Sequence, residues 1–185
     1  GLMHLGTART ALIAWLRARA CGGRFILRIE DIDTPRVVPG AEEALIRDLR
    51  WLGLDWDEGP DVSGPHAPYR QSERLHLYAQ AFDQLKAQGL LFPCRCSRKE
   101  IATLASAPHG PDGPRYPGTC RMAEPTTTPL AAWRFRLDTP PSFTDLAQGP
   151  QTPSPHADDF VVQRADGLFS YQLEWSSMTS PWASP

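Results

Sequence analysis

The 185-residue sequence has no strong excess of either charge and no long apolar run. Its formal net charge is -2, so no global basic field indicates a nucleic-acid-binding protein. Contacts to nucleic acid would have to come from local clusters such as Arg17, Arg19, Arg24 and Arg28. The apolar stretches are too short to cross a bilayer, and no secretory leader opens the chain. We therefore expect a cytoplasmic protein with no membrane partner.

Cysteine is scarce, and proline is confined to a few regions. The four cysteines are too few and too clustered for a disulfide scaffold. In a reducing compartment, the Cys94-x-Cys96 pair followed by Cys120 is typical of a metal site, whereas Cys21 is expected to be packed at the end of a helix. The 19 prolines concentrate in 108–117, in 125–155 and at the end of the chain, which indicates loops.

Three segments have the apolar spacing of helices. The first runs from Gly6 to Ala20, and its predicted inward face consists of Ala8, Leu12, Ile13, Leu16 and Ala20. The second begins after Gly40 and ends at Gly53, where glycine can adopt the left-handed conformation of a helix end. The third is expected to run from Ser72, as its N-cap, to Gly89.

Short runs rich in branched and aromatic residues separate these helices and predict strands. Residues 24–29 form one such run and deliver Glu30 at its carboxyl end. Further strands are expected at 90–96 and 133–137, and a hairpin is expected with its turn at 165–167. Because strand and helix alternate in the first half, the sequence predicts an α/β fold with a Rossmann-like, doubly wound parallel sheet.

The tetrapeptide His4-Leu5-Gly6-Thr7 stands where the first helix begins. The N-terminus of a helix presents unpaired N–H groups and a partial positive charge, so phosphate binds there readily. Gly6 would let a ligand approach the backbone, and the imidazole of His4 could donate to a phosphate. Taken alone, the tetrapeptide is equally well explained as an ordinary helix start with a capping threonine.

Four runs in fixed order change that interpretation, namely Gly22 to Asp33, Trp51 to Gly59, Tyr69 to Arg74 and Asp166 to Leu173. Together with the tetrapeptide they closely resemble the catalytic domain of glutamyl-tRNA synthetases and of their shortened paralogues, the glutamyl-Q tRNA(Asp) synthetases. The resemblance covers roughly residues 1–173. Several motifs in the right order are far more specific than any one of them.

The resemblance implies an enzyme that activates glutamate as an adenylate with ATP, in the presence of Mg²⁺. It places His4, Gly6 and Thr7 against ATP, as the catalytic and nucleotide-binding group. It also places Glu30 on the α-amino group of glutamate, with Tyr171 contacting the same amino acid. Adenylation needs few reactive side chains, because positioning and charge stabilisation do most of the work.

Both amino-acid contacts have a simpler alternative. Glu30 could form a surface salt bridge with Arg28 or Arg36. Tyr171 could be a half-buried aromatic residue of the predicted hairpin. Only the ordered run of motifs favours the ligand-binding roles.

The cysteines predict a tetrahedral zinc site, because Cys94, Cys96 and Cys120 can fill three of its corners. On spacing alone the fourth ligand is either His109, the chemically ordinary choice, or Tyr116. The resemblance favours Tyr116, because glutamyl-Q synthetases bind zinc through a Cys-x-Cys…Tyr-x-x-x-Cys set. We therefore expect one zinc ion per chain.

The sequences of segments 30–36, 116–121 and 143–149 are more similar to those of the glutamyl-Q synthetases than to those of their longer relatives. The implied acceptor is queuosine in the anticodon loop of tRNA(Asp), and the protein is expected to act as a monomer. Three alternatives stay open: a discriminating glutamyl-tRNA synthetase that charges tRNA(Glu), a non-catalytic tRNA-binding remnant, and a small-molecule adenylyltransferase of the same superfamily.

The resemblance predicts four regions: a nucleotide- and amino-acid-binding half (1–93), a zinc-binding insertion (94–125), a continuation of the catalytic domain (126–173) and an aberrant tail (174–185). The sequence lacks the family's Arg and Ser ahead of the first motif, its "KMSKS"-type loop and its second glutamate-binding Arg.

The sequence of the tail, residues 174–185, does not resemble that of the family. After Leu173 a Ser/Pro/Trp string replaces the family's continuation, roughly Ala-Val-Val-Val-Asp-Asp. If Glu174 is encoded by GAG and both Ser176 and Ser177 by TCG, another reading frame gives Val-Val-Val-Asp-Asp at this place. We therefore expect a frameshift, a disordered tail and negligible glutamate adenylation by this polypeptide.

Overall fold

The structure is a computed structural model that describes residues 2–33, 36–97, 99–101, 116–122, 132–139, 141–152 and 159–173. Its described residues fall into two compact units, one within Gly1–Leu77 and the other within Tyr78–Met178. His109 and residues 174–185 lie outside the described residues, so the expectations placed on them stay predictions. The four regions expected from the sequence likewise stay predictions.

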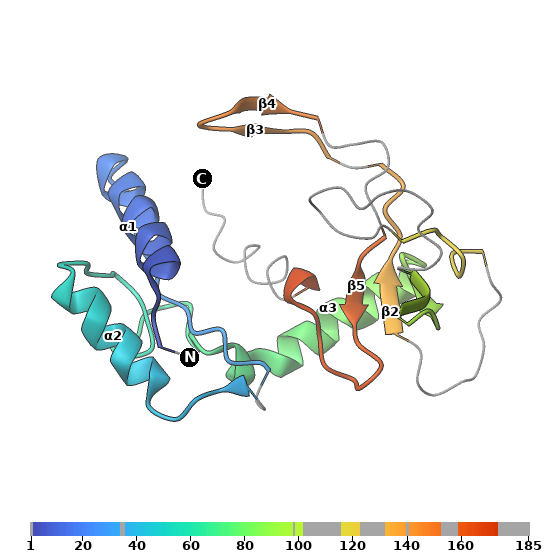
Figure 1. Cartoon of the computed structure of the whole chain (residues 1–185), viewed down its shortest axis with the longest axis horizontal. Coiled ribbons are helices and arrows are strands. Elements are labelled where there is room, and N and C mark those ends of the chain that lie inside the picture. The colour runs from blue at the N-terminus through green and yellow to red at the C-terminus, as the bar shows by residue number, and fades with distance from the viewer. Residues whose placement is uncertain are drawn as a thin grey trace. The chain divides into compact units, whose positions relative to one another are not determined.

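The first unit contains α1 (Leu5–Ala20), α2 (Ala41–Trp51) and a short 3₁₀ helix, η2 (Gln71–Arg74) (Figure 1). Both long helices start and end within two residues of their predicted limits. The backbone at Gly53 has a φ of 79°, the left-handed value predicted for the end of α2. The predicted cap at Ser72 is wrong, because Ser72 lies inside η2 and the N-cap is Arg70.

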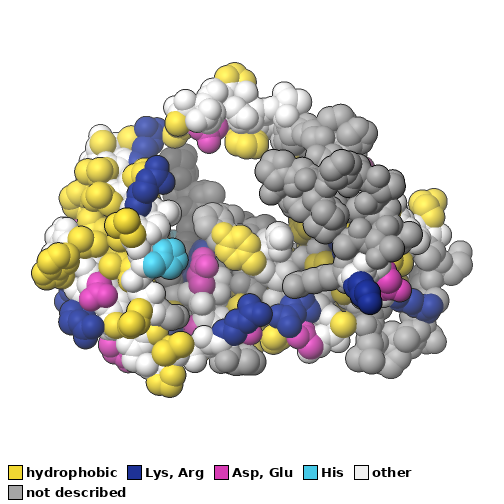
Figure 2. All heavy atoms as spheres, in the orientation of Figure 1, with side chains coloured by type: hydrophobic (Ala, Val, Ile, Leu, Met, Phe, Trp, Pro, Cys, Tyr) yellow, Lys and Arg dark blue, Asp and Glu magenta, His cyan; other side chains and the backbone are white. Residues whose placement is uncertain are grey.

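The predicted inward face of α1 is also wrong. Leu12, Ile13 and Leu16 are 44%, 50% and 52% exposed, and they belong to an apolar surface over α1 and α2 that Figure 2 shows. The helix instead packs through Ala11 and Trp15 against a core of Leu27, Leu49, Leu54 and Trp56. Polar contacts decide this orientation, since the indole N–H of Trp15 donates to Asp55 over 2.7 Å.

Three extended segments of the first unit pair in parallel. Ile26 bridges to Glu58, and Ile29 bridges to Arg70. The N–H of Leu27 donates to the Glu58 carbonyl (2.9 Å), and the N–H of Ile29 donates to the Tyr69 carbonyl (2.9 Å). The strand predicted at 24–29 therefore forms short parallel bridges, and Glu30 follows directly at its carboxyl end.

The second unit is built on an antiparallel sheet, which the expectation of a parallel sheet did not include. The sheet has the order β1-β2-β5, with β1 at Leu91–Cys94, β2 at Ala132–Phe135 and β5 at Val161–Gln163. A separate hairpin joins β3 (Phe143–Asp145) to β4 (Gly149–Gln151). The chain enters this unit along α3 (Leu75–Ala87).

Aromatic residues fill the core between α3 and the sheet of the second unit. Phe82 packs with Leu91, Val162 and Leu173. The ring of Trp133 packs edge-to-face against the ring of Phe82, with the two ring centroids 5.7 Å apart. The turn predicted at 165–167 is present, because the N–H of Arg164 donates to the Leu168 carbonyl over 2.8 Å. No helix among the described residues is long and apolar enough to cross a membrane.

Candidate functional site

The N-terminus of α1 brings together the three residues expected to contact ATP. His4 is the N-cap, and its Nδ1 accepts a hydrogen bond of 3.3 Å from the N–H of Thr7. Its Nε2 lies 3.3 Å from the hydroxyl of Thr7. Gly6 makes room for this ring, because a Cβ built there would lie 3.1 Å from Nδ1 and Cε1 of His4. His4 therefore caps the helix. Thr7, the residue expected to be the cap, instead donates its backbone N–H to His4.

Glu30 lies at the end of its extended segment and pairs with Arg28, whose Nη2 donates to it over 2.9 Å. This is the simpler alternative foreseen for Glu30, and the carboxylate remains 47% exposed. The neighbouring Asp31 has a role that the sequence did not indicate. It accepts from the N–H of Ser72 (2.9 Å) and from its hydroxyl, so it joins the strand end to η2.

Tyr171 lies in a short helical turn, residues 171–173, after the bridge between Gln163 and Phe169. The second arm of the predicted hairpin is therefore a strand only at its start. Tyr171 is 55% exposed, so it is about half buried as in the simpler alternative, but it lies in the helical turn and not on a strand. Its contact with the amino acid stays a prediction.

The predicted arginine cluster is largely neutralised within the protein. Arg19 pairs with Asp55 (3.0 Å) and Asp57 (2.7 Å), and Arg24 pairs with Glu58 (2.7 Å). Hydrogen bonds to Asp57, followed by those to Asp55, raise the pKa of Arg19, which reflects this pairing. These ion pairs tie α1 and the segment after it to residues 55–58.

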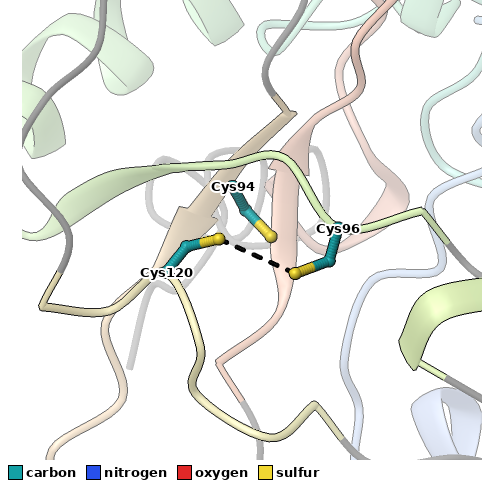
Figure 3. Close-up of side chains that lie close together, drawn as sticks. All are labelled: Cys94, Cys96 and Cys120. Carbon is teal, nitrogen blue, oxygen red and sulfur yellow. Dashed lines mark hydrogen bonds between the residues drawn. The ribbon is translucent and has the colours of Figure 1, made fainter. Parts of the chain in front are cut away.

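The second unit assembles the cysteine cluster that the spacing predicted (Figure 3). The sulfurs of Cys94, Cys96 and Cys120 lie within 4.8 Å of one another, and those of Cys96 and Cys120 are 3.7 Å apart. This separation is far longer than a disulfide bond of about 2 Å, and all are free cysteines. Cys21, expected to be packed, is exposed at the end of α1.

Tyr116 completes the cluster from the other side. Its hydroxyl accepts from the N–H of Cys120 (2.8 Å) and lies 3.6 Å from the sulfur of Cys94. Cys94 and Tyr116 are buried in a small core with Phe92 and Ile101. The four side chains thus converge on one place, although they come from β1, the segment after it and residues 116–122.

Burial dominates the acid–base properties of this cluster. It raises the pKa of Cys96 to about 12, with further contributions from the other cysteines, and it raises the pKa of Tyr116. Burial acts in the same direction on Cys120. There, hydrogen bonds from the backbone of Arg95 and from Tyr116 outweigh it and lower the pKa. A buried group of this kind ionises most easily when a cation replaces its proton.

The distances fit a tetrahedral metal centre. With metal–sulfur bonds of about 2.3 Å, two sulfurs at tetrahedral corners lie roughly 3.8 Å apart. With a metal–oxygen bond of about 2.0 Å, a sulfur and an oxygen lie roughly 3.5 Å apart. The separations of 3.7 Å between Cys96 and Cys120 and of 3.6 Å between Cys94 and Tyr116 are close to these edges. Three thiols and a phenol therefore suit a soft, tetrahedral cation such as zinc.

A buried carboxylate, Glu58, forms a second polar centre that the sequence did not reveal. Its side chain is fully buried. It accepts from the hydroxyl of Tyr69, from Nδ1 of His66 (2.9 Å) and from Arg24 (2.7 Å). Gly64 passes directly over it, because a Cβ there would lie 2.8 Å from the Glu58 carboxylate.

Comparison with known proteins identifies the family of this chain. Residues 1–174 match the model of the catalytic domain of class I tRNA synthetases for glutamate and glutamine (E and Q). The chain belongs to this family. The match ends one residue beyond Leu173, the last residue that resembles the family's sequence.

Curated relatives include both branches of the family. A glutamyl-Q tRNA(Asp) synthetase from Symbiobacterium thermophilum is 58% identical over 94% of this chain and 57% of its own length. A glutamate–tRNA ligase from Dehalococcoides mccartyi is 44% identical over 94% of this chain and 36% of its own length. The chain thus spans about half the length, or less, of these relatives.

A solved structure gives the same fold. The crystal structure of a glutamate tRNA ligase from Elizabethkingia meningosepticum in complex with its amino acid superposes with a TM-score of 0.77. The two proteins are 30% identical, and the match covers 96% of this chain and 39% of the other.

Proposed function

We propose that this domain belongs to an enzyme that activates glutamate as glutamyl-adenylate and transfers it to queuosine in the anticodon loop of tRNA(Asp). The observation that carries the proposal is the range of identities, which is 44–58% for glutamyl-Q tRNA(Asp) synthetases and 43–44% for glutamate–tRNA ligases. The Cys-x-Cys…Tyr-x-x-x-Cys cluster supports it. Charging of tRNA(Glu) is the second candidate, because glutamate–tRNA ligases share the same match over 94% of the chain.

In the first step, a carboxylate oxygen of glutamate attacks the α-phosphorus of ATP, and the bond to pyrophosphate breaks. The N–H groups at the start of α1, together with His4, would stabilise the negative charge on the phosphates. Glu30 would hold the ammonium group of glutamate, exchanging its bond with Arg28 for the ligand. In the second step, a hydroxyl of the acceptor attacks the carbonyl carbon, and AMP leaves.

We further propose that Cys94, Cys96, Tyr116 and Cys120 hold one zinc ion. The ion would join β1 to the segment 116–122, so its chemistry in this domain is structural cross-linking. A closed set of four protein ligands leaves no open position for a substrate, which suits this role.

Metal analysis of the purified chain is expected to give about one zinc per polypeptide. Cys94→Ser/Cys120→Ser should lose the metal, because two of the four ligands are removed. Cys21→Ser is the matched control, since Cys21 is exposed and lies outside the cluster. Zinc that persists at full stoichiometry in the double variant would show that the metal binds elsewhere.

Glutamate transfer by the product of the complete gene is expected on queuosine-modified tRNA(Asp). An anticodon loop is a single-stranded target with splayed bases, which a protein can recognise individually. The measurement is incorporation of labelled glutamate into queuosine-modified tRNA(Asp), queuosine-free tRNA(Asp) and tRNA(Glu). Incorporation on tRNA(Glu), or equal incorporation with and without queuosine, would favour the second candidate.

A further inference from the structure

Arg134 is a buried cation whose described contacts include no carboxylate. It is 8% exposed at the centre of β2, and its Nη1 donates to the carbonyl of Asp159 over 2.7 Å. Its Nε has no hydrogen-bond partner within the described part of the chain. A buried charge without a counter-charge is costly, so the position calls for a negative partner.

The same cation lies over the ring of Tyr116. The guanidinium carbon of Arg134 lies 3.9 Å from the centroid of that ring, well within the range of a cation–π contact. Phe92 lies near the same ring, with centroids 6.3 Å apart and planes tilted by 30°. The tyrosine ring thus has both a cation and an aromatic side chain as neighbours.

The register of the sheet explains this placement. Arg134 on β2 is directly opposite Phe92 on β1. Because side chains alternate between the faces of a strand, Phe92 and Cys94 share one face, and Arg134 lies on the same face. Arg134 is therefore placed on the side of the sheet that carries the cysteine cluster.

The orientation of the Tyr116 ring decides where its hydroxyl lies. That hydroxyl is 2.8 Å from the N–H of Cys120 and 3.6 Å from the sulfur of Cys94. A ring that turned away would remove the oxygen from the place where the sulfurs meet. The contact with Arg134 opposes such a rotation.

We propose that Arg134 is a positioning residue of the metal centre: it holds the Tyr116 ring and balances the negative charge of the occupied site. A Zn²⁺ ion among three thiolates and a phenolate carries a net negative formal charge, which the buried guanidinium complements. This inference rests on the metal site proposed above. It assigns to Arg134 a role that is distinct from binding the metal.

The test is the apparent affinity of the chain for Zn²⁺, measured by competition with a chelator, and the visible absorption of the Co²⁺-substituted chain. Arg134→Met should weaken Zn²⁺ binding about 10-fold or more, as for other groups that orient metal ligands. Lys86→Met is the matched control. Lys86 lies 4.4 Å from the ring of Trp133, the neighbour of Arg134 on β2, and Trp133 belongs to the core packed around Phe82 and Leu91.

The decisive measurement repeats Arg134→Met in a Tyr116→Phe background. The positioning role acts through Tyr116, so the loss of Zn²⁺ affinity should be clearly smaller there, with only the charge effect left, and the Co²⁺ spectrum should no longer respond to Arg134→Met. An equal loss of affinity in both backgrounds would overturn the inference. Arg134→Lys keeps the charge without the planar group and should bind Zn²⁺ with intermediate affinity. It therefore serves as the test if the methionine variant does not fold.

The outcomes also separate this inference from the metal site itself. Wild-type protein that binds no stoichiometric metal would overturn both. Wild-type protein that binds zinc through the cysteines, with unchanged affinity in Arg134→Met, would overturn only the role of Arg134.

Discussion

Replacing Glu58 by alanine is expected to lower the free energy of unfolding by about 3–5 kcal/mol, the usual cost of removing one partner from a buried, charged network. The change leaves the buried hydroxyl of Tyr69 without its acceptor and removes the partner of Arg24 and His66. Urea denaturation at neutral pH measures the loss. Glu43→Ala is the control, because Glu43 is an exposed glutamate of α2. Equal stability of the two variants would contradict the structural role of Glu58.

The same carboxylate predicts a dependence on pH. Burial raises the pKa of Glu58, but hydrogen bonds from Tyr69 and His66, together with Arg24, outweigh it and hold the pKa below its ordinary value of 4.5. A lowered pKa in the folded state means that the stabilisation is complete above this value and is lost as the pH falls through the folded pKa. The stability difference between wild type and Glu58→Gln should therefore shrink at acidic pH. A difference that grew on acidification would have the wrong sign.

Replacing Glu30 by alanine in the product of the complete gene should reduce kcat/KM for glutamate by about 10²–10⁴-fold. The reason is the loss of a desolvated ion pair with the ammonium group, which costs about 3–5 kcal/mol when one side is removed. The KM for ATP should stay nearly unchanged, because the nucleotide is proposed to bind at the start of α1. Glutamate-dependent ATP–pyrophosphate exchange measures both quantities.

The pairing of Glu30 with Arg28 provides an internal check on this assignment. The side chain of Glu30 is 47% exposed. If its carboxylate forms only the salt bridge with Arg28, Glu30→Ala should change kcat/KM for glutamate little. Glu43→Gln is the matched control for loss of a glutamate charge in the same unit. Normal use of glutamate by the Glu30 variant would remove Glu30 from the amino-acid site.

The helices and the cysteine cluster could be predicted because glycine positions and cysteine spacing carry their signals. Gly53 marks the end of α2, and the spacing of Cys94, Cys96 and Cys120 indicates their convergence. The face of α1 could not be predicted from apolar spacing. Trp15 turns toward the core to reach Asp55, a residue 40 positions away along the chain.

The remaining polar sites could not be predicted either, because their residues contact partners that are far away in the sequence. Asp31 binds Ser72, which is 41 residues away, and Arg134 lies over Tyr116 through pairing of β1 with β2. Glu58 sits in a run of acidic and aromatic residues that resembles an exposed loop. Its burial depends on Tyr69 and on the absence of a side chain at Gly64. No periodic pattern carries such information.

The capping of α1 by His4 makes ligand binding at this helix an exchange of partners. Any anion that accepts from the N–H of Thr7 must first displace Nδ1 of His4. An N-cap hydrogen bond contributes about 0.5–2 kcal/mol to helix stability. The Thr7–His4 bond is long, at 3.3 Å, and is therefore weak, so displacing His4 costs little free energy. Once displaced, the imidazole is free to turn toward the newcomer. In the proposed ATP site, one side chain would thus cap the helix and, once displaced, interact with the ligand.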